Sequence, residues 1–105
     1  MTDKVIVLST CGSEEEAGKI AQHLVGNRLA ACVNVIPQVK SIYRWQEKVQ
    51  SAQEWLLLVK TTAERFTLVR DAIHRLHSYE LPECISIAID GGSVPYLQWI
   101  EDNVK

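Results

Sequence analysis

The chain has 105 residues, of which 47% are hydrophobic and 23% charged, with a formal net charge of −2. This length fits one domain with a modest core, and the composition is ordinary for a globular protein. Lysine and arginine are scattered without a basic stripe, which argues against a nucleic-acid-binding protein, and no apolar run is long enough to span a membrane. We therefore expect residues 1–105 to form a single domain that binds neither nucleic acid nor membrane.

The N-terminal part predicts a strand followed by a helix. Residues 4–11 contain four consecutive apolar residues, which is typical of a strand buried on both faces. Gly12 ends the strand, and Ser13 then begins a helix with Glu16 completing a capping box three residues later. The helix ends at Gly26 and Asn27, and its apolar residues fall on one face at helical spacing: Ala17, Ile20, Ala21, Leu24 and Val25.

Residues 30–62 predict a long hairpin. β-branched and aromatic residues dominate this stretch, and a polar group at residues 46–48 interrupts it near its middle. Each arm has about 14 residues, against about 5–6 in a usual strand, and would reach about 45 Å. A helix of about 15 residues covers only about 22 Å, so the chain's own helices leave much of the hairpin uncovered. Pro37 lacks a backbone N–H, which predicts an edge strand or a bulge at that point.

The C-terminal part predicts a helix, a strand and a short final helix. Thr61 and Glu64 form a second capping box, and the helix behind it has one apolar face made by Phe66, Val69, Ile73 and Leu76. Residues 78–83 form a loop closed by Pro82, and residues 84–89 form the last strand. The tail begins a short helix near Pro95, with an apolar face that contains Tyr96, Trp99 and Ile100.

The element order is therefore βαββαβ with a short C-terminal helix. This order predicts an α+β, ferredoxin-like fold whose antiparallel sheet has strand order 4-1-3-2 and carries both helices on one face. The run from Trp55 to Val59 lacks the alternation of a strand with one wet face, so both of its faces should be buried. A second copy of the chain is the simplest cover for the open face and for the aromatic residues near the hairpin tip, Tyr43 and Trp45.

Metal-binding side chains gather at one predicted edge of the sheet. Cys11 ends the first strand and Cys84 begins the fourth, and the loop that leads into this edge carries His77 and Glu83. Thiolate, imidazole and carboxylate groups can together hold copper or zinc, so these four residues are a candidate divalent-cation site. The alternative is that the cysteines are only small buried apolar groups, and no CxxC or HxxxH spacing decides between the two.

An enzyme is less well supported. Ser9 to Gly12 followed by a capped helix could make a small anion site, but the sequence has no glycine-rich phosphate loop and no evident nucleophile with a base. We therefore predict no catalytic residues. The three cysteines are widely spaced and odd in number, and the N-terminus lacks a signal-peptide pattern, so we expect a cytoplasmic protein without a disulfide framework.

Several stretches together resemble the CutA divalent-cation tolerance family. They are LAACVN at 29–34, Ile36 with Pro37, SIYRW at 41–45, LVKT at 58–61, HSYELPE at 77–83 and YLQW at 96–99, and they cover almost the whole chain in order. The resemblance implies a ferredoxin-like homotrimer, similar in architecture to the nitrogen-regulatory PII proteins. It also implies a role in tolerance to copper and other divalent cations, with binding of such ions proposed, and it supplies no established catalytic residues.

On this reading, the aromatic residues expected at the subunit interface are Tyr43, Trp45, Trp55, Tyr96 and Trp99. The alternative is a trimeric signalling or scaffold module that binds a small ligand or a protein partner and affects metal tolerance only indirectly. Two positions depart from the family pattern. Glu47 stands where the family usually has a glycine, so the hairpin turn is expected to change type or widen. Cys84 stands where the family tends to have an aliphatic residue.

Overall fold

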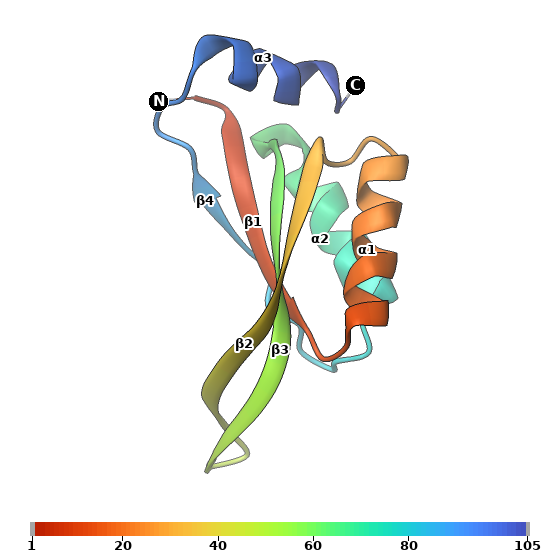
Figure 1. Ribbon diagram of the computed structural model, residues 1–105, viewed down its shortest axis with the longest axis vertical. Coiled ribbons are helices and arrows are strands. Elements are labelled where there is room, and N and C mark those ends of the chain that lie inside the picture. Colours follow the sequence, from red (N-terminus) through yellow and green to blue (C-terminus); the bar gives the residue numbers. More distant parts are fainter. Residues whose placement is uncertain (1, 105) are drawn as a thin grey trace.

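Four strands form one antiparallel sheet in the order β2-β3-β1-β4, which confirms the predicted ferredoxin-like α+β fold (Figure 1). The structure is a computed structural model that describes residues 2–104. The elements are β1 (Lys4–Cys11), α1 (Glu14–Gly26), β2 (Cys32–Trp45), β3 (Lys48–Thr62), the 3-10 turn η1 (Ala63–Arg65), α2 (Phe66–Leu76), β4 (Ile85–Ala88) and α3 (Val94–Asp102).

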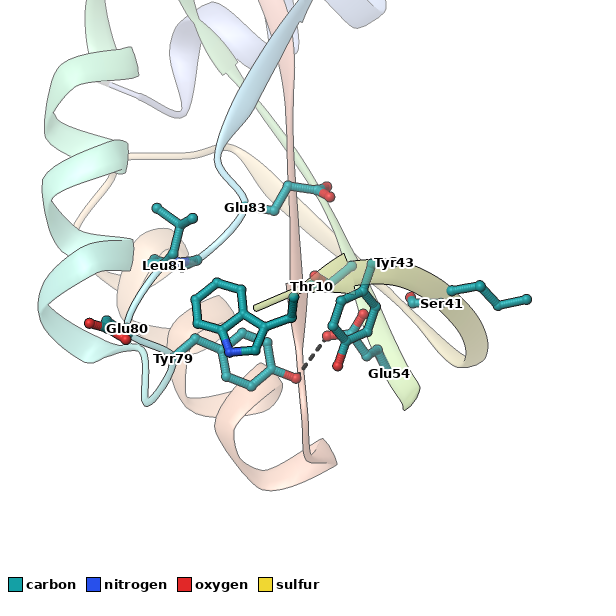
Figure 2. Close-up of a pocket in the computed structure, with 11 residues that line it drawn as sticks. Thr10, Ser41, Tyr43, Glu54, Tyr79, Glu80, Leu81 and Glu83 are labelled. Carbon is teal, nitrogen blue, oxygen red and sulfur yellow. Dashed lines mark hydrogen bonds between the residues drawn. The ribbon is translucent and has the colours of Figure 1, made fainter. Parts of the chain in front are cut away.

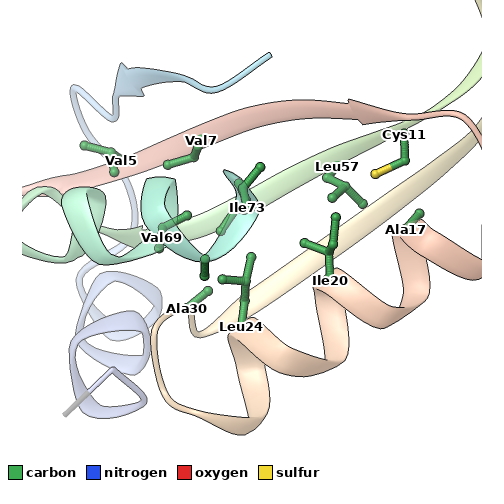
Figure 3. Packing of buried hydrophobic residues seen from close by; sticks show 12 residues of the cluster. Val5, Val7, Cys11, Ala17, Ile20, Leu24, Ala30, Leu57, Val69 and Ile73 are labelled. Atoms are coloured by element: carbon green, nitrogen blue, oxygen red, sulfur yellow. The ribbon is translucent and has the colours of Figure 1, made fainter. Parts of the chain in front are cut away.

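The main core lies between the sheet and the two helices α1 and α2, which cover the same face (Figure 1). Its members alternate along the strands and repeat at helical spacing, as Figure 3 shows: Val5, Val7, Cys11, Leu57 and Val59 from the sheet, and Ala17, Ile20, Leu24, Val69, Ala72 and Ile73 from the helices. The alternation follows from the two-residue period of a strand. The apolar side chains between these positions point to the other face, which no helix covers.

That second face is apolar and only partly covered. In β1, Ile6 and Leu8 are half-buried rather than buried, so the expectation that both faces of this strand are dry is wrong for the single chain. Their partners in β4, Ile87 and Ile85, are 51% and 52% exposed. In β3, Leu58 lies beside Leu8 and is also half-buried. We call this surface the open face.

The start of α1 forms by a local cap, as predicted. The Ser13 hydroxyl accepts a hydrogen bond from the backbone N–H of Glu16 at 3.2 Å. The second half of the predicted capping box is not made, because the Glu16 carboxylate instead binds the backbone N–H and the hydroxyl of Ser78. Val25, expected on the buried face, is 41% exposed.

The second predicted capping box is wrong. Thr61 and Thr62 are the last residues of β3, where they pair with Val5 and Lys4 of β1. The Thr61 hydroxyl is buried and donates a 2.7 Å hydrogen bond to the backbone carbonyl of Leu29. Pairing with β1 therefore extends the strand through the position at which the local sequence pattern predicted a helix cap.

The β2–β3 hairpin projects beyond the helices in Figure 1. Its turn has two residues, Gln46 and Glu47, with φ angles of 50° and 66°, so the expected widening does not occur. Both angles are left-handed, which matches the turn that suits a two-residue hairpin. The register shifts between Ile36 and Val39, so Pro37 lies in a bulge of a strand at the sheet edge, as predicted.

The short helix α3 crosses the end of the sheet opposite the hairpin tip (Figure 1). Lys4 anchors it through an ion pair with Glu101 at 2.9 Å, and Lys4 also pairs with Asp3. Ile100 and Val104 form a second small core with Ala31. None of the helices in residues 2–104 has the length and apolar character needed to cross a membrane.

Candidate functional site

An open cleft of about 650 Å³ lies between the hairpin and the loop at residues 77–83 (Figure 2). The hairpin contributes residues of its edge strand β2 and one residue of β3, β1 contributes Thr10 near its end, and the loop closes the opposite side. The lining residues are Thr10, Ser41, Ile42, Tyr43, Trp45, Glu54, Tyr79, Glu80, Leu81, Pro82 and Glu83. The cleft thus combines aromatic walls with carboxylate groups, and we call it the Glu54 cleft.

Glu54 and Tyr79 form a partly buried polar pair in this cleft. The Tyr79 hydroxyl donates a 2.7 Å hydrogen bond to Oε2 of Glu54, whose residue is only 6% exposed. Burial, together with this carboxylate, raises the pKa of Tyr79, so its hydroxyl keeps its proton and acts as a donor. Gly12 makes room for this hydroxyl, because a Cβ at position 12 would lie 2.9 Å from it.

His77 fixes the loop that carries Tyr79. Its Nε2 lies 2.7 Å from the backbone carbonyl of Thr10, and its Nδ1 accepts a 3.1 Å hydrogen bond from the backbone N–H of Tyr79. A nitrogen that accepts a hydrogen bond cannot carry the proton, so these contacts select the tautomer protonated at Nε2. The Glu16 carboxylate lies 3.4 Å from Nδ1 of His77, and it also accepts a hydrogen bond from the hydroxyl of the next residue, Ser78. The loop is therefore held to both β1 and α1.

The four predicted metal ligands do not converge on one point. Cys11 faces the helices, where it lies in the main core (Figure 3), and burial raises the pKa of its thiol to about 12. Cys84 packs against the same core, and burial also raises its pKa. Glu83 lines the Glu54 cleft instead, and His77 uses both ring nitrogens in the contacts above.

Cys11 and Cys84 are offset along the sheet because of the register between β1 and β4. Ile85, the first residue of β4, pairs with Leu8, whereas Cys11 lies three residues beyond Leu8 along β1. The end of β1 and the start of β4 therefore lie at the same end of the sheet, as expected, but they are offset along the strand direction. No three His, Cys, Asp or Glu side chains within residues 2–104 form a group that could hold a metal ion. A preformed copper site needs deprotonated thiols and a free imidazole nitrogen. Here the thiols keep their protons, and both nitrogens of His77 are engaged in hydrogen bonds.

The predicted interface residues fall into three environments. Tyr43 and Trp45 line the Glu54 cleft, and Tyr43 is 41% exposed. Tyr96 and Trp99 stack on each other at 5.5 Å and are each 42% exposed on α3, where Lys60 donates to the Tyr96 hydroxyl. Trp55 packs against the main core of its own chain. Four of the five aromatic groups therefore lie at the surface of the single chain or in its cleft.

The roles of two residues were missed at the level of sequence, one that lines the cleft and one that lies next to Tyr79. Glu54 was not singled out, although it is a lone carboxylate directly before the apolar run that starts at Trp55. Gly12 was assigned to the end of the first strand and to a candidate anion site, whereas in the structure it provides space for Tyr79. The available signal for Glu54 was the position of a charged residue next to an apolar strand segment. Nothing in the local sequence could reveal the contact of Gly12 with Tyr79.

Residues 5–103 match the family model described as "CutA1 divalent ion tolerance protein". The chain belongs to this family. A "Divalent-cation tolerance protein CutA" of Thermus thermophilus is 48% identical over 98 residues, which cover 93% of this chain and 95% of that protein. The human "Protein CutA" is 42% identical over 91 residues, and the match covers 87% of this chain but only 51% of the human protein.

Solved CutA structures share the fold over nearly the whole chain. The structure of the Thermus thermophilus protein has a TM-score of 0.95 at 46% identity and covers 97% of this chain and 99% of its own. A structure from Archaeoglobus fulgidus, titled as a periplasmic divalent cation tolerance protein, has a TM-score of 0.94 at 39% identity, with coverage of 97% and 99%. The long hairpin and the small C-terminal helix are thus family features.

Proposed function

We propose that this CutA-family chain is a non-enzymatic, cytoplasmic divalent-cation tolerance protein that acts as a homotrimer. The tolerance role follows from the family. The cytoplasmic location rests on the cysteine usage described above. The absence of an evident nucleophile with a base supports a role without catalysis.

The main support for the proposed trimer is the apolar surface that the single chain leaves uncovered. On the hairpin, Ile42 and Val49 are 67% and 68% exposed, and on the open face Ile85 and Ile87 are more than half exposed. Large exposed apolar areas of this kind usually mark an association surface. The edge strand β2 also presents unpaired backbone groups. Cyclic association of three copies would cover both features in a closed assembly.

Direct binding of copper by Cys11, His77, Glu83 and Cys84 stays a prediction. In the described chain, a metal ion at His77 would have to displace either the Thr10 carbonyl or the Tyr79 N–H. The buried Cys11 thiol would also have to lose a proton that its surroundings retain. Copper binding at these residues therefore requires a rearrangement of the loop at residues 77–83.

The second candidate function is a trimeric module that binds a small ligand or a protein partner and affects metal tolerance indirectly. The Glu54 cleft favours it, because the cleft has the size of a small-molecule site while residues 2–104 contain no preformed metal cluster.

Calorimetric titration of the metal-free protein with Cu(II) and Zn(II), with a Cys11→Ser/Cys84→Ser variant beside it, separates the two candidates. Direct binding predicts a stoichiometric copper site that the double variant weakens. Equal copper binding by both proteins, or no binding above that of exposed histidine, favours the indirect role. Sedimentation of the wild-type protein at micromolar concentration tests the trimer, and an 11.8 kDa monomer would contradict it.

A further inference from the structure

We propose that Arg44 of a second copy of the chain enters the Glu54 cleft and pairs with the carboxylate of Glu54. The cleft is then a contact between neighbouring subunits, completed by a side chain that its own chain does not supply. This inference rests on the proposed trimer and specifies one of its contacts. It depends on the missing counter-charge of Glu54, on the place of Arg44 in the hairpin, and on the different chemistry of the two faces of the hairpin.

Glu54 has no counter-charge in its own chain. The residue is 6% exposed, and the Tyr79 hydroxyl that donates to it at 2.7 Å is neutral. Within residues 2–104 no salt bridge involves Glu54, and none of the described residues that line the cleft is a lysine or an arginine. A buried carboxylate is costly without an opposite charge, so a cation that arrives from another chain would stabilise it.

The two cations on the outer half of β2 do not reach Glu54 within one chain. Glu54 pairs with Val39, whereas Arg44 pairs with Val49, five residues nearer the hairpin tip. At roughly 3.3 Å per residue, this separates Arg44 from Glu54 by about 16 Å along the strands. Lys40 is next to Val39, but successive residues of a strand point to opposite faces, so Lys40 lies on the other side of the hairpin from Glu54.

The two faces of the hairpin differ in chemistry. Tyr43, Trp45 and Glu54 give the cleft face aromatic rings and a carboxylate (Figure 2). Alternation places Arg44 on the back, and its cross-strand partner Val49 shares that face, because opposed residues of an antiparallel pair point the same way. Val49 is 68% exposed, and no salt bridge within residues 2–104 involves Arg44. The back therefore presents an apolar side chain and a cation.

These two faces are complementary, so the back of one hairpin suits the cleft face of another copy. A contact between two different faces is head-to-tail, and repeated head-to-tail contacts can close into a ring, as the proposed trimer requires. The guanidinium of Arg44 can donate two N–H groups to one carboxylate and can stack on an aromatic ring such as Tyr43. The hydrogen bond from Tyr79 already holds the Glu54 carboxylate in position.

Sedimentation over a range of concentrations tests the pairing through Arg44→Gln, Glu54→Gln and the double variant. Arg44→Gln should weaken the assembly at least about tenfold, because it leaves Glu54 buried without a partner, and Arg44→Lys, which keeps the charge, should weaken it less. The double variant should lose less than the product of the two single effects, since neither charge is then left unpaired. Arg70→Gln, at a half-exposed side chain on α2, is the matched control and should change nothing.

Cross-linking shows whether the pair joins two chains. Arg44→Cys/Glu54→Cys, treated with a short bismaleimide at a concentration at which it sediments as a trimer, should give covalent dimers and trimers on a denaturing gel. Arg70→Cys/Glu54→Cys should not, and Arg44→Cys alone controls for links through the natural cysteines.

The outcomes separate this contact from the trimer itself. A wild-type trimer that Arg44→Gln leaves equally stable, or one in which the two single effects simply multiply, overturns the pairing and leaves the proposed trimer standing. A trimeric double-cysteine variant without covalent dimers does the same. A wild-type monomer overturns both proposals.

Discussion

The carboxylate of Glu16, in the first turn of α1, accepts hydrogen bonds from both the backbone N–H and the hydroxyl of Ser78, 62 residues further along the chain. This contact joins the start of one helix to the loop that follows the other. It also lies next to His77, so the loop wall of the Glu54 cleft is held from the helix side. A residue expected to cap its own helix thus stabilises a distant loop.

Glu16→Ala should lower the free energy of unfolding by about 0.5–1.5 kcal/mol beyond the effect of helix capping, because it removes the charged acceptor of two exposed hydrogen bonds from Ser78. The control is Glu14→Ala in the same first turn, which is exposed and should cost only about 0.3–1 kcal/mol through the helix dipole. Urea denaturation followed by circular dichroism measures both. Equal effects of the two substitutions would show that the contact with Ser78 contributes nothing beyond helix capping.

Tyr79→Phe should destabilise the fold by about 1–3 kcal/mol, because it removes the hydrogen bond donor of the buried Glu54 carboxylate. Tyr96→Phe is the matched control, since its hydroxyl bonds Lys60 in an exposed position and should matter by at most about 1 kcal/mol. Thermal unfolding of both variants distinguishes them. A Tyr79→Phe variant as stable as the wild type would show that this bond does not stabilise the buried carboxylate of Glu54.

Glu47→Gly should raise the free energy of unfolding by up to about 1 kcal/mol, because glycine adopts the φ of 66° at this turn without steric cost. Part of that gain is offset by the greater freedom of glycine in the unfolded chain. Ser51→Gly in the exposed part of β3 is the control and should lower stability by about 0.5–1 kcal/mol. Denaturant titration reports both changes, and a destabilising Glu47→Gly would contradict the prediction.

Cys11 should make the stability of the protein fall in alkaline solution. Burial raises the pKa of its thiol from 9.0 to about 12, so the folded state keeps a proton that the unfolded state has released. The stabilising effect of this proton is fully present below pH 9 and is lost as pH rises towards about 12. Cys11→Ala should flatten the decline of unfolding free energy between these values, whereas Cys32→Ala should not. Identical slopes in all three proteins would contradict the prediction.

Trp45→Ala should weaken the proposed trimer more than Trp99→Ala, because Trp45 lies at the far end of β2, where the chain's own helices do not reach. Trp99 keeps a stacking partner in Tyr96 within its own chain. Sedimentation over a range of concentrations measures the loss of assembly. A stronger effect of Trp99→Ala would instead place the main contact at α3.

The fold was predictable because its signals are local and agree with one another. The Ser13 cap, the apolar face of α1 and the long β-rich arms each follow from spacing within a short segment. The bulge at Pro37 follows from the missing N–H of one residue. The errors came where tertiary contacts compete with a local motif. Thr61 is held in β3 by pairing with Val5, although its sequence resembles a helix cap.

The candidate site was less predictable, because it depends on side-chain direction and on register. The order of the strands correctly brought the ends of β1 and β4 to one edge. It could not reveal that Cys11 points into the core while Glu83 lines the cleft, since this depends on which face each position occupies. Glu54 gained its importance only from burial and from the approach of Tyr79.

The bulge in β2 limits how another strand can approach the edge of the sheet. Pro37 offers no N–H, and Gln38 adopts a φ of 59°, so the row of outward backbone groups is broken between Ile36 and Val39. An incoming strand can form a regular ladder with residues 32–36 or with residues 39–45, but not in one register along both. The edge therefore rejects the continuous strand stacking that builds fibrils, while leaving two short segments on which a closed, specific assembly can form.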